Sequence, residues 1–268
     1  MAKQPESTSS SQSVQRFLFI GNSHTYFNDM PHLFARLCEI NAKQIAVFLI
    51  AHGGKGLDFH KDEPEVRFNL LYGNYDFVVL QHVAHPFGPE ETFYSSAQAI
   101  DSWIRFADAQ NENKKPTRKI AYMTWTQQGD EEGQPHMAQA YQKMASLIGA
   151  RVAPVGAVWQ RLRKAFPALP LYGPDGQHAS PLGSLLAACV IYAAAYGMAP
   201  LFEKEDFPHC FGLTDFAECQ KPNHTPFFPN LCPPANVAEE WPSIWPVWQK
   251  EISKQLENFN NIDKTFVL

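Results

Sequence analysis

The chain has 268 residues, which is enough for one sizeable domain or for one domain with an appendage. Hydrophobic residues make up 45% of the chain and charged residues 18%, a balance that is typical of a globular protein and argues against wholesale disorder. The formal net charge is −5, and no run of Lys and Arg is long enough to form a nucleic-acid footprint. We therefore expect no nucleic-acid partner.

The N-terminal segment, residues 1–14, is polar and rich in Ser and Gln, and we predict a flexible leader there. It lacks the apolar core of a secretory signal, so we expect a cytoplasmic protein by default, although a trimmed signal would leave the same sequence. The best candidate for a membrane span, residues 185–195, has only about half of the roughly 20 residues that a spanning helix needs. We expect no membrane insertion.

Short apolar runs alternate with helical patterns along the next part of the chain. The predicted strands are residues 16–20, 45–51, 75–81, 120–125 and 151–155. The predicted helices are residues 30–41, 91–109, 135–148 and 182–196. Continuously apolar strands that alternate with helices indicate an α/β fold, with a parallel sheet covered by helices on both faces. In such sheets the active groups collect at the carboxyl ends of the strands.

The character of the sequence changes after residue 200. The segment 201–248 is rich in Pro and contains Trp241, Trp245 and Trp248. We predict that this segment wraps over the core in an extended conformation and that a helix follows over about 243–259. The three Trp side chains could form a sugar-stacking platform, but an aromatic lock that holds the tail on the core is the favoured interpretation.

The five cysteines fall into two groups. Cys38 and Cys189 lie in apolar helical patterns and are interpreted as small buried hydrophobic residues. Cys210, Cys219 and Cys232 lie in the Pro-rich segment, where two of them could pair in an oxidising compartment, but their spacing does not determine the pairing. Metal ligation by these three is disfavoured, because no C-x-x-C spacing is present.

The first motif that carries chemistry is Gly21-Asn22-Ser23-His24-Thr25, directly after the first predicted strand. A Ser on a tight turn between a strand and a helix exposes its hydroxyl at the edge of the sheet. Its backbone N–H also points toward the charge that develops on a bound carbonyl oxygen. Gly21 would let the chain turn sharply. Alone, this motif is more often a plain turn, so Ser23 is a candidate nucleophile only if a base lies beside it.

The second motif is Asp175-Gly176-Gln177-His178, which precedes the last core helix. A hydroxyl is a poor nucleophile near neutral pH and needs an adjacent base, for which His is the best-suited side chain. An Asp three residues earlier, in a turn, can reach the other imidazole nitrogen and hold the ring in the required tautomer. The alternative is a helix N-cap loop in which both side chains are merely solvated.

Together, the two motifs resemble the SGNH/GDSL hydrolase superfamily, with Gly-Asn-Ser in place of the family's Gly-Asp-Ser. The resemblance covers residues 15–200 and is most specific over 171–181. It implies a three-layer α/β/α flavodoxin-like domain with a parallel five-stranded sheet, followed by a Pro- and aromatic-rich C-terminal extension over 201–268. It also implies that Ser23 is the nucleophile, His178 the general base and Asp175 its orienting acid, with no cofactor and no metal.

The same resemblance implies an oxyanion hole built from Ser23 and two further blocks. The second block is a glycine after the second strand, for which Gly54 is the best match and Gly53 and Gly56 are alternatives. The third block is normally an Asn after the third strand, and this chain has none there. Gln81 or His85 is chemically able to donate in its place, which leaves the third donor open.

These inferences predict a serine esterase that works through an acyl-enzyme. We expect a small-molecule or carbohydrate ester as its substrate, with a short acyl group such as acetyl as a mild preference. One alternative is a binding or scaffolding protein of the same fold, in which the missing Asn marks lost catalysis. Another is a metal-dependent hydrolase with zinc on two or three of His52, His60, His82 and His85, which lack a carboxylate partner at ligand spacing. The sequence does not indicate an oligomeric state.

Overall fold

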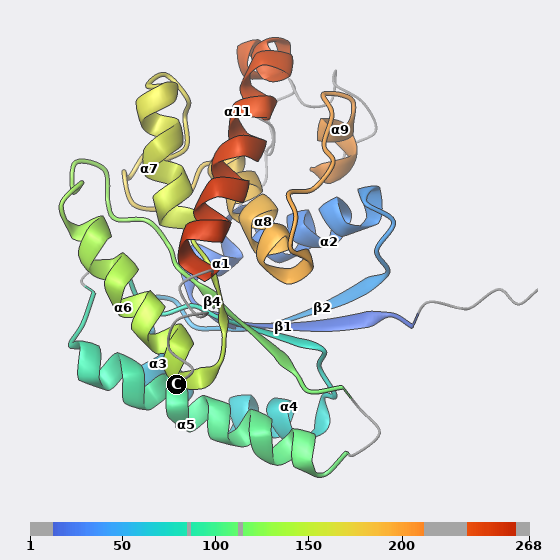
Figure 1. Cartoon of the computed structure of the whole chain (residues 1–268), viewed down its shortest axis with the longest axis vertical. Helices are drawn as coiled ribbons and strands as arrows, with labels where there is room; N and C mark the ends of the chain where they lie inside the picture. The colour runs from blue at the N-terminus through green and yellow to red at the C-terminus, as the bar shows by residue number, and fades with distance from the viewer. Residues whose placement is uncertain (1–12, 85–86, 112–114, 212–234, 261–268) are drawn as a thin grey trace, which may run out of the picture.

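The computed structural model describes residues 13–84, 87–111, 115–211 and 235–260, and it has three layers (Figure 1). The central layer is a parallel sheet with the strand order β2-β1-β3-β4-β5. Its strands are β1 (Gln15–Gly21), β2 (Ile45–Ala51), β3 (Phe77–Leu80), β4 (Arg118–Tyr122) and β5 (Arg151–Ala153). The sheet confirms the predicted α/β class and all five predicted strands.

Helices cover both faces of the sheet. On the upper face in Figure 1 lie α2 (Met30–Ile40), α7 (Val155–Ala165), α8 (Pro181–Tyr196) and α11 (Ala235–Asn260). On the lower face lie α3 (Leu57–His60), α4 (Pro64–Tyr72), α5 (Glu90–Ala109) and α6 (Gly133–Ile148). The short elements α1 (Ser23–Tyr26) and η1 (Phe27–Asp29) join β1 to α2, and α9 (Asp206–Cys210) packs near α2. None of the described helices combines the length and the apolar character needed to cross a bilayer.

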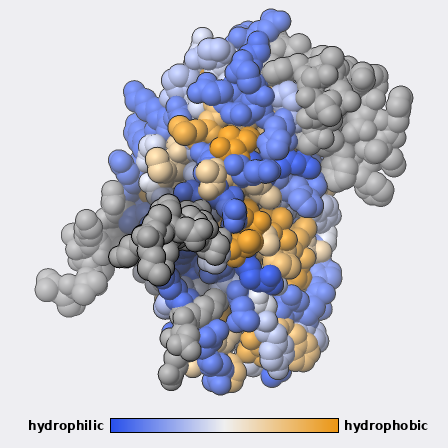
Figure 2. All heavy atoms as spheres, turned by 90° about the vertical axis from the view of Figure 1, so that its right-hand side faces the viewer, coloured by the Kyte–Doolittle hydropathy of each residue, from blue (hydrophilic) through white to orange (hydrophobic). Residues whose placement is uncertain are grey.

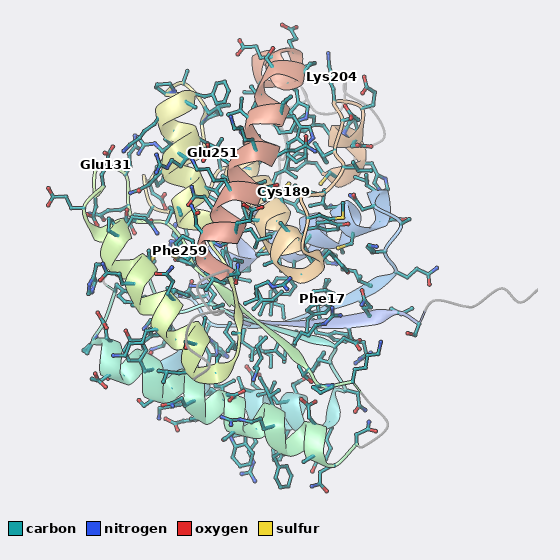
Figure 3. All side chains as sticks on the ribbon, in the orientation of Figure 1. Phe17, Glu131, Cys189, Lys204, Glu251 and Phe259 are labelled. Carbon is teal, nitrogen blue, oxygen red and sulfur yellow. The ribbon has the colours of Figure 1, made fainter. Side chains whose placement is uncertain are left out.

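The side chains of β1 alternate between two hydrophobic clusters. Phe17 and Phe19 point into the cluster below α2 and α8, whereas Leu18 and Ile20 point into the cluster above α4 and α5. Figure 3 labels Phe17 and Cys189 of α8, which both belong to the upper cluster. All four side chains of β1 are fully buried, as expected for a central parallel strand covered on both faces. This confirms the prediction for the first strand.

The edge strand β2 is less buried than the central strand β1. Leu49 of this strand is 42% exposed. Figure 2 faces the side of the molecule that lies to the right in Figure 1, and apolar residues there form an orange area bounded by polar ones.

The strand β4 ends at Tyr122, whereas the sequence predicted a strand as far as Trp125. The physical reason is its partner: β5 has only three residues and pairs with Ile120 to Tyr122. Beyond that point the chain leaves the ladder, and the N–H of Gly156 donates to the carbonyl of Met123 at 3.2 Å. The predicted fifth strand is also shorter than expected, because α7 begins at Val155. The helices α3, α4, α7 and α9 were not predicted from the sequence.

The helix α11 begins eight residues before the predicted start at 243, so the prediction of an extended chain over 235–242 is wrong. Pro242 and Pro246 lie inside the helix, although each lacks an N–H to donate. The helix packs against α7, α8 and β5. The prediction is also wrong over 206–210, which form α9, and residues 212–234 of the predicted wrap lie outside the described residues.

The Trp side chains of α11 explain why the helix persists through its two prolines. Trp241, Trp245 and Trp248 recur at helical spacing, and all three are buried. The ring of Trp241 contacts Phe202 and Phe207, with 4.7 Å between the ring centroids of Phe207 and Trp241, and the ring of Trp248 contacts that of Trp241. Burial of so much aromatic surface outweighs the lost backbone hydrogen bonds. The aromatic lock is therefore observed, and the buried rings are not available as a sugar platform.

Cys38, Cys189 and Cys210 are buried free thiols. Burial raises the pKa of Cys210 to about 12 and raises the pKa values of Cys38 and Cys189 as well. The interpretation of Cys38 and Cys189 as small hydrophobic core residues is confirmed. Cys219 and Cys232 lie outside the described residues.

Candidate active site

The structure brings together three polar side chains that the sequence places far apart. The hydroxyl oxygen of Ser23 lies 2.8 Å from Nε2 of His178, across a separation of 155 residues. The Nδ1 of His178 lies 2.5 Å from Oδ2 of Asp175. A hydroxyl, an imidazole and a carboxylate joined in this order are the groups that acyl transfer by a serine nucleophile requires.

The local sequence explains how Ser23 reaches this position. Asn22 is extended and caps α1, because its side-chain oxygen accepts from the N–H of His24 at 3.0 Å. The side-chain amide of Asn22 also donates to the carbonyl of Lys55 at 2.9 Å. This bond ties the turn that carries Ser23 to the loop after β2. Ser23 then begins α1 at the carboxyl end of β1.

Gly21 serves this turn through close packing. A Cβ at this position would lie 2.5 Å from Oε1 of Gln81 and 2.5 Å from the hydroxyl of Thr25. Gly21 belongs to β1 and has no left-handed backbone angle. The glycine is therefore needed for the close approach of Gln81 and not, as the sequence suggested, for a sharp turn.

Gln81 lies against the turn that carries Ser23 and is fully buried. Its side-chain oxygen accepts from the N–H of Asn22 at 2.8 Å and from the hydroxyl of Thr25 at 2.9 Å. Its side-chain nitrogen donates to the carbonyl of His82. Both ends of the amide thus have partners inside the protein, and the side chain is fully buried, so this placement does not favour Gln81 as the oxyanion donor. His85, the other candidate, lies outside the described residues.

The loop after β2 contains three glycines with different surroundings. Gly54 has a left-handed φ of +70°, and a Cβ there would have no atom within 4 Å. A Cβ at Gly53 would lie 3.1 Å from the hydroxyl of Tyr26, and one at Gly56 would lie 2.5 Å from the ring of His82. Of the three glycines, Gly54 is the one beside open space. It directly precedes Lys55, whose carbonyl accepts from the side chain of Asn22.

The loop that carries His178 is held by its own backbone. Oδ1 of Asp175 accepts from the N–H groups of Gln177 and His178, each at 3.0 Å. Gly176 has a φ of +67°, which a glycine adopts without strain. The indole N–H of Trp125 donates to the carbonyl of Gln177 at 2.8 Å. The ring of Trp125 is buried, so this residue belongs to the core and its N–H also holds the loop of His178.

The electrostatics of Asp175 suit an orienting role. Burial raises the pKa of this carboxyl, but hydrogen bonds from the His178 ring and from the backbone N–H groups of Gln177 and His178 outweigh that effect and lower the pKa to about 2. The carboxylate is therefore ionised at neutral pH and accepts the proton of Nδ1. Nε2 is then left as the acceptor that faces the hydroxyl of Ser23.

The histidines considered as zinc ligands have protein partners. His52 pairs with Glu65, His60 with the carbonyl of Gly21 and His82 with the N–H of Leu57, at distances of 2.7 to 2.9 Å. Burial lowers the pKa of His60 and lowers that of His82 to about 4. Within the described ranges, no group of three His, Cys, Asp or Glu side chains is arranged to hold a metal ion.

Two hollows flank the His178 loop. The first has a volume of about 530 Å³ and lies between the loops after β3 and β4 and the start of α6; it is lined by Ala84, Phe87, Thr126, Gln127, Asp130, Gly133, His136, Met137 and Gln177. The second has a volume of about 520 Å³ and is lined by Phe27, Asn28, Tyr172, Gly173, Pro174, Asp175, His178, Ala179, Ser180 and Pro181. We refer to them as the polar groove and the His178 pocket.

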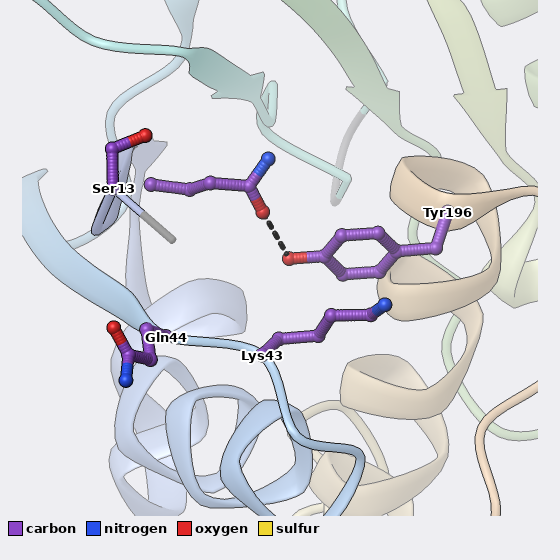
Figure 4. Close-up of a pocket in the computed structure, with 5 residues that line it drawn as sticks. Ser13, Lys43, Gln44 and Tyr196 are labelled. Carbon is purple, nitrogen blue, oxygen red and sulfur yellow. Dashed lines mark hydrogen bonds between the residues drawn. The ribbon is translucent and has the colours of Figure 1, made fainter. Parts of the chain in front are cut away.

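A further hollow of about 350 Å³ lies away from this site (Figure 4). Its lining includes Gln15, Lys43 and Tyr196, and the Tyr196 hydroxyl donates to the side chain of Gln15 at 2.9 Å. Gln15 opens β1, whereas Ser23 follows the other end of that strand. The hollow in Figure 4 is therefore at the amino-terminal edge of the sheet, opposite the edge where Ser23 lies.

Comparison with solved structures shows a similar fold in several proteins. A candidate SGNH hydrolase from Slackia heliotrinireducens is 28% identical, with a TM-score of 0.54 over 68% of this chain and 100% of that chain. A DUF4886 family protein from Bacteroides uniformis is 18% identical, with a TM-score of 0.54 over 77% of this chain and 99% of that chain. A variant of an acetyl-xylooligosaccharide esterase from Geobacillus is 15% identical, with a TM-score of 0.50 over 69% of this chain and 95% of that chain.

No family model and no curated protein matches the sequence. The five-stranded parallel sheet and the 28% identity to the candidate SGNH hydrolase nevertheless place the chain in the SGNH/GDSL hydrolase superfamily, as the sequence resemblance implied. It is an SGNH/GDSL-type hydrolase.

Proposed function

We propose that the chain hydrolyses a carboxylic ester through an acyl-enzyme formed on Ser23. The observation that carries the proposal is the series of hydrogen bonds from Ser23 to His178 at 2.8 Å and from His178 to Asp175 at 2.5 Å. His178 takes the proton of the Ser23 hydroxyl as its oxygen attacks the ester carbonyl. The protonated His178 then donates to the departing alcohol, and Asp175 stabilises the imidazolium between these steps.

The second half of the reaction reuses the same groups. His178 takes a proton from a water molecule, which attacks the acyl-enzyme and releases the carboxylic acid and Ser23. We assign the backbone N–H groups of Ser23 and Gly54 to the tetrahedral oxyanion in both halves. Gln81 supports this arrangement from below, because it holds the N–H of Asn22 and so fixes the turn that presents Ser23.

The test is the replacement Ser23→Ala, measured with nitrophenyl acetate. We expect kcat to fall by about 10³-fold or more with the fold retained, as for other triad members. Ser95→Ala is the matched control, since Ser95 is an exposed residue of α5. A fluorophosphonate probe should label the unmodified protein at Ser23 and leave the Ser23→Ala variant unlabelled. Unchanged turnover of Ser23→Ala would remove Ser23 from the mechanism.

For the substrate, we propose an ester of a short acyl group with a hydroxylated alcohol such as a sugar. The support is the lining of the polar groove, where the exposed side chains of Gln127 and Gln177 offer amide groups beside the ring of Phe87. A screen of nitrophenyl esters of increasing chain length, alongside acetylated sugars, tests it. Acetyl esters should give the highest kcat/KM, and a preference for long acyl chains would contradict the proposal.

A binding or scaffolding role is the second candidate. It is favoured by one observation: Gln81 follows the third strand, where the family has its oxyanion Asn, and its amide is taken up inside the protein. Folded protein that fails to react with the fluorophosphonate probe would favour this role over catalysis.

A further inference from the structure

The turn η1 has an unusual backbone. Asn28 has φ 53° and ψ 24°, and the next residue, Asp29, has φ 52° and ψ 45°, so two successive residues other than glycine are left-handed. Such conformations are uncommon for residues with a Cβ, although Asn and Asp tolerate them best. They persist where the surrounding structure holds them, and they cluster at functional sites. The contacts of this turn show what it is held against.

The side-chain amide of Asn28 forms hydrogen bonds with the segment that carries His178 and with the helix that follows it. Its nitrogen donates to the carbonyl of Ala179 at 2.9 Å and to the hydroxyl of Ser184 at 2.9 Å. The hydroxyl of Ser184 in turn donates to the carbonyl of Phe27 at 3.3 Å. Because Ala179 directly follows His178, these bonds fasten the nucleophile segment to the segment of the base.

The ring of Phe27 lies flat on the imidazole of His178. The ring centroids are 3.9 Å apart and the planes differ by 9°. Phe27 is 37% exposed, so its side chain does not serve as a core residue. On the same imidazole, the ring of His24 stands at 5.2 Å. The stacked phenyl ring restricts rotation of the imidazole about its side-chain bonds and so keeps Nε2 directed at Ser23.

We infer that the turn Phe27-Asn28-Asp29 positions the general base. Phe27 sets the plane of the His178 ring. Asn28 sets the position of the His178 backbone relative to Ser23, because it binds the carbonyl of Ala179. This inference rests on the proposed function, in which His178 is the base. It assigns Phe27 and Asn28 as positioning residues, since both act through His178. The short path from Ser23 through α1 to Phe27 then fixes nucleophile and base in one local unit.

Phe27 also lines the His178 pocket, so a role in substrate contact makes a different prediction. Loss of a contact that binds substrate and transition state equally would raise KM and would depend on which ester is used. Loss of base positioning would lower kcat by a similar factor for every ester, because proton transfer is common to them all.

The experiment uses Phe27→Leu and Asn28→Gly, each assayed with nitrophenyl acetate and nitrophenyl butyrate. Phe27→Leu removes the flat ring and keeps an apolar side chain. Asn28→Gly accepts the left-handed backbone without strain and removes the amide. For both variants we expect kcat to fall about tenfold on both esters, with KM changed by less than about twofold. Phe27→Tyr restores the ring and should restore kcat. Phe68→Leu, at an exposed Phe of α4, is the matched control.

Three outcomes would overturn the inference: kcat retained within about twofold in Phe27→Leu and Asn28→Gly, an effect confined to KM, or an effect that differs between the two esters. The rate of fluorophosphonate labelling at Ser23 provides a second readout that should fall with kcat. Ser23→Ala separates this inference from the proposed function. If the unmodified protein has no activity that depends on Ser23, the proposed function fails; if it has such activity and the turn variants keep it, only the inference about the turn fails.

Discussion

His82 is a buried imidazole whose titration should make the protein sensitive to mild acid. Its Nδ1 accepts from the N–H of Leu57 at 2.9 Å, and its ring stacks on Phe93 with 4.8 Å between centroids. Burial lowers the pKa of His82 from 6.5 to about 4; Asp58, at 3.9 Å, opposes the change and His60 adds to it. The folded protein therefore holds His82 neutral at a pH where the unfolded chain is protonated.

The sign and size of the effect follow from this difference. As the pH falls through 6.5 the unfolded chain takes up a proton, whereas folded His82 does so only near pH 4. The stability due to neutral His82 is therefore complete above about pH 6.5 and is lost progressively toward pH 4. Between pH 7 and pH 5 the loss is about 2 kcal/mol, and its limit at lower pH is roughly 3 kcal/mol.

The assay is urea denaturation at pH 7 and at pH 5, carried out on the unmodified protein and on His82→Gln. A Gln side chain can still accept from the N–H of Leu57 but does not titrate. Other groups titrate in both proteins, including His60, whose pKa is also lowered by burial. Their contributions to the pH dependence of the free energy of unfolding cancel when the two proteins are compared. The free energy of unfolding should fall by about 2 kcal/mol more in the unmodified protein than in the variant. Equal losses in the two proteins would refute the reasoning.

Three further predictions concern the site and the packing around it. Asp175→Asn should lower kcat by about 10³- to 10⁴-fold with little change in unfolding midpoint, because an amide no longer fixes the required tautomer of His178; a loss below about tenfold would contradict the orienting role. Gly183→Ala should destabilise the fold by about 1 to 3 kcal/mol, since its Cβ would stand 2.2 Å from a backbone carbonyl oxygen. Gly88→Ala, with no atom within 4 Å of the new Cβ, is its control, and equal unfolding midpoints for the two would refute the packing argument. Trp248→Ala should cost about 3 to 5 kcal/mol, because this side chain of α11 is fully buried, and denaturation with no loss would show that α11 is not part of the core.

The sequence by itself determined the class of fold and the chemistry of two motifs. The strands were recognisable because burial on both faces of a parallel sheet demands a continuous apolar run, which is a local property of the chain. Ser23 and His178 became candidates only when the turn after the first strand and the Asp-x-x-His motif were taken together, because each motif alone is ambiguous. These signals are local too, since a turn and a capped helix are specified by neighbouring residues. The helix α11 was misjudged in part, because its prolines were given more weight than its Trp spacing.

Only the tertiary structure decided which groups meet. The order of the sheet places β3 beside β1, so that Leu80 pairs with Ile20 and Gln81 comes to lie under Gly21 and Asn22. An amide side chain can donate or accept, and nothing in the sequence tells which of its ends faces the turn. The stacking of Phe27 on His178 likewise depends on two segments that the sheet order brings together. Contacts between distant segments are properties of the assembled layers, and for that reason the support of the site became visible only in three dimensions.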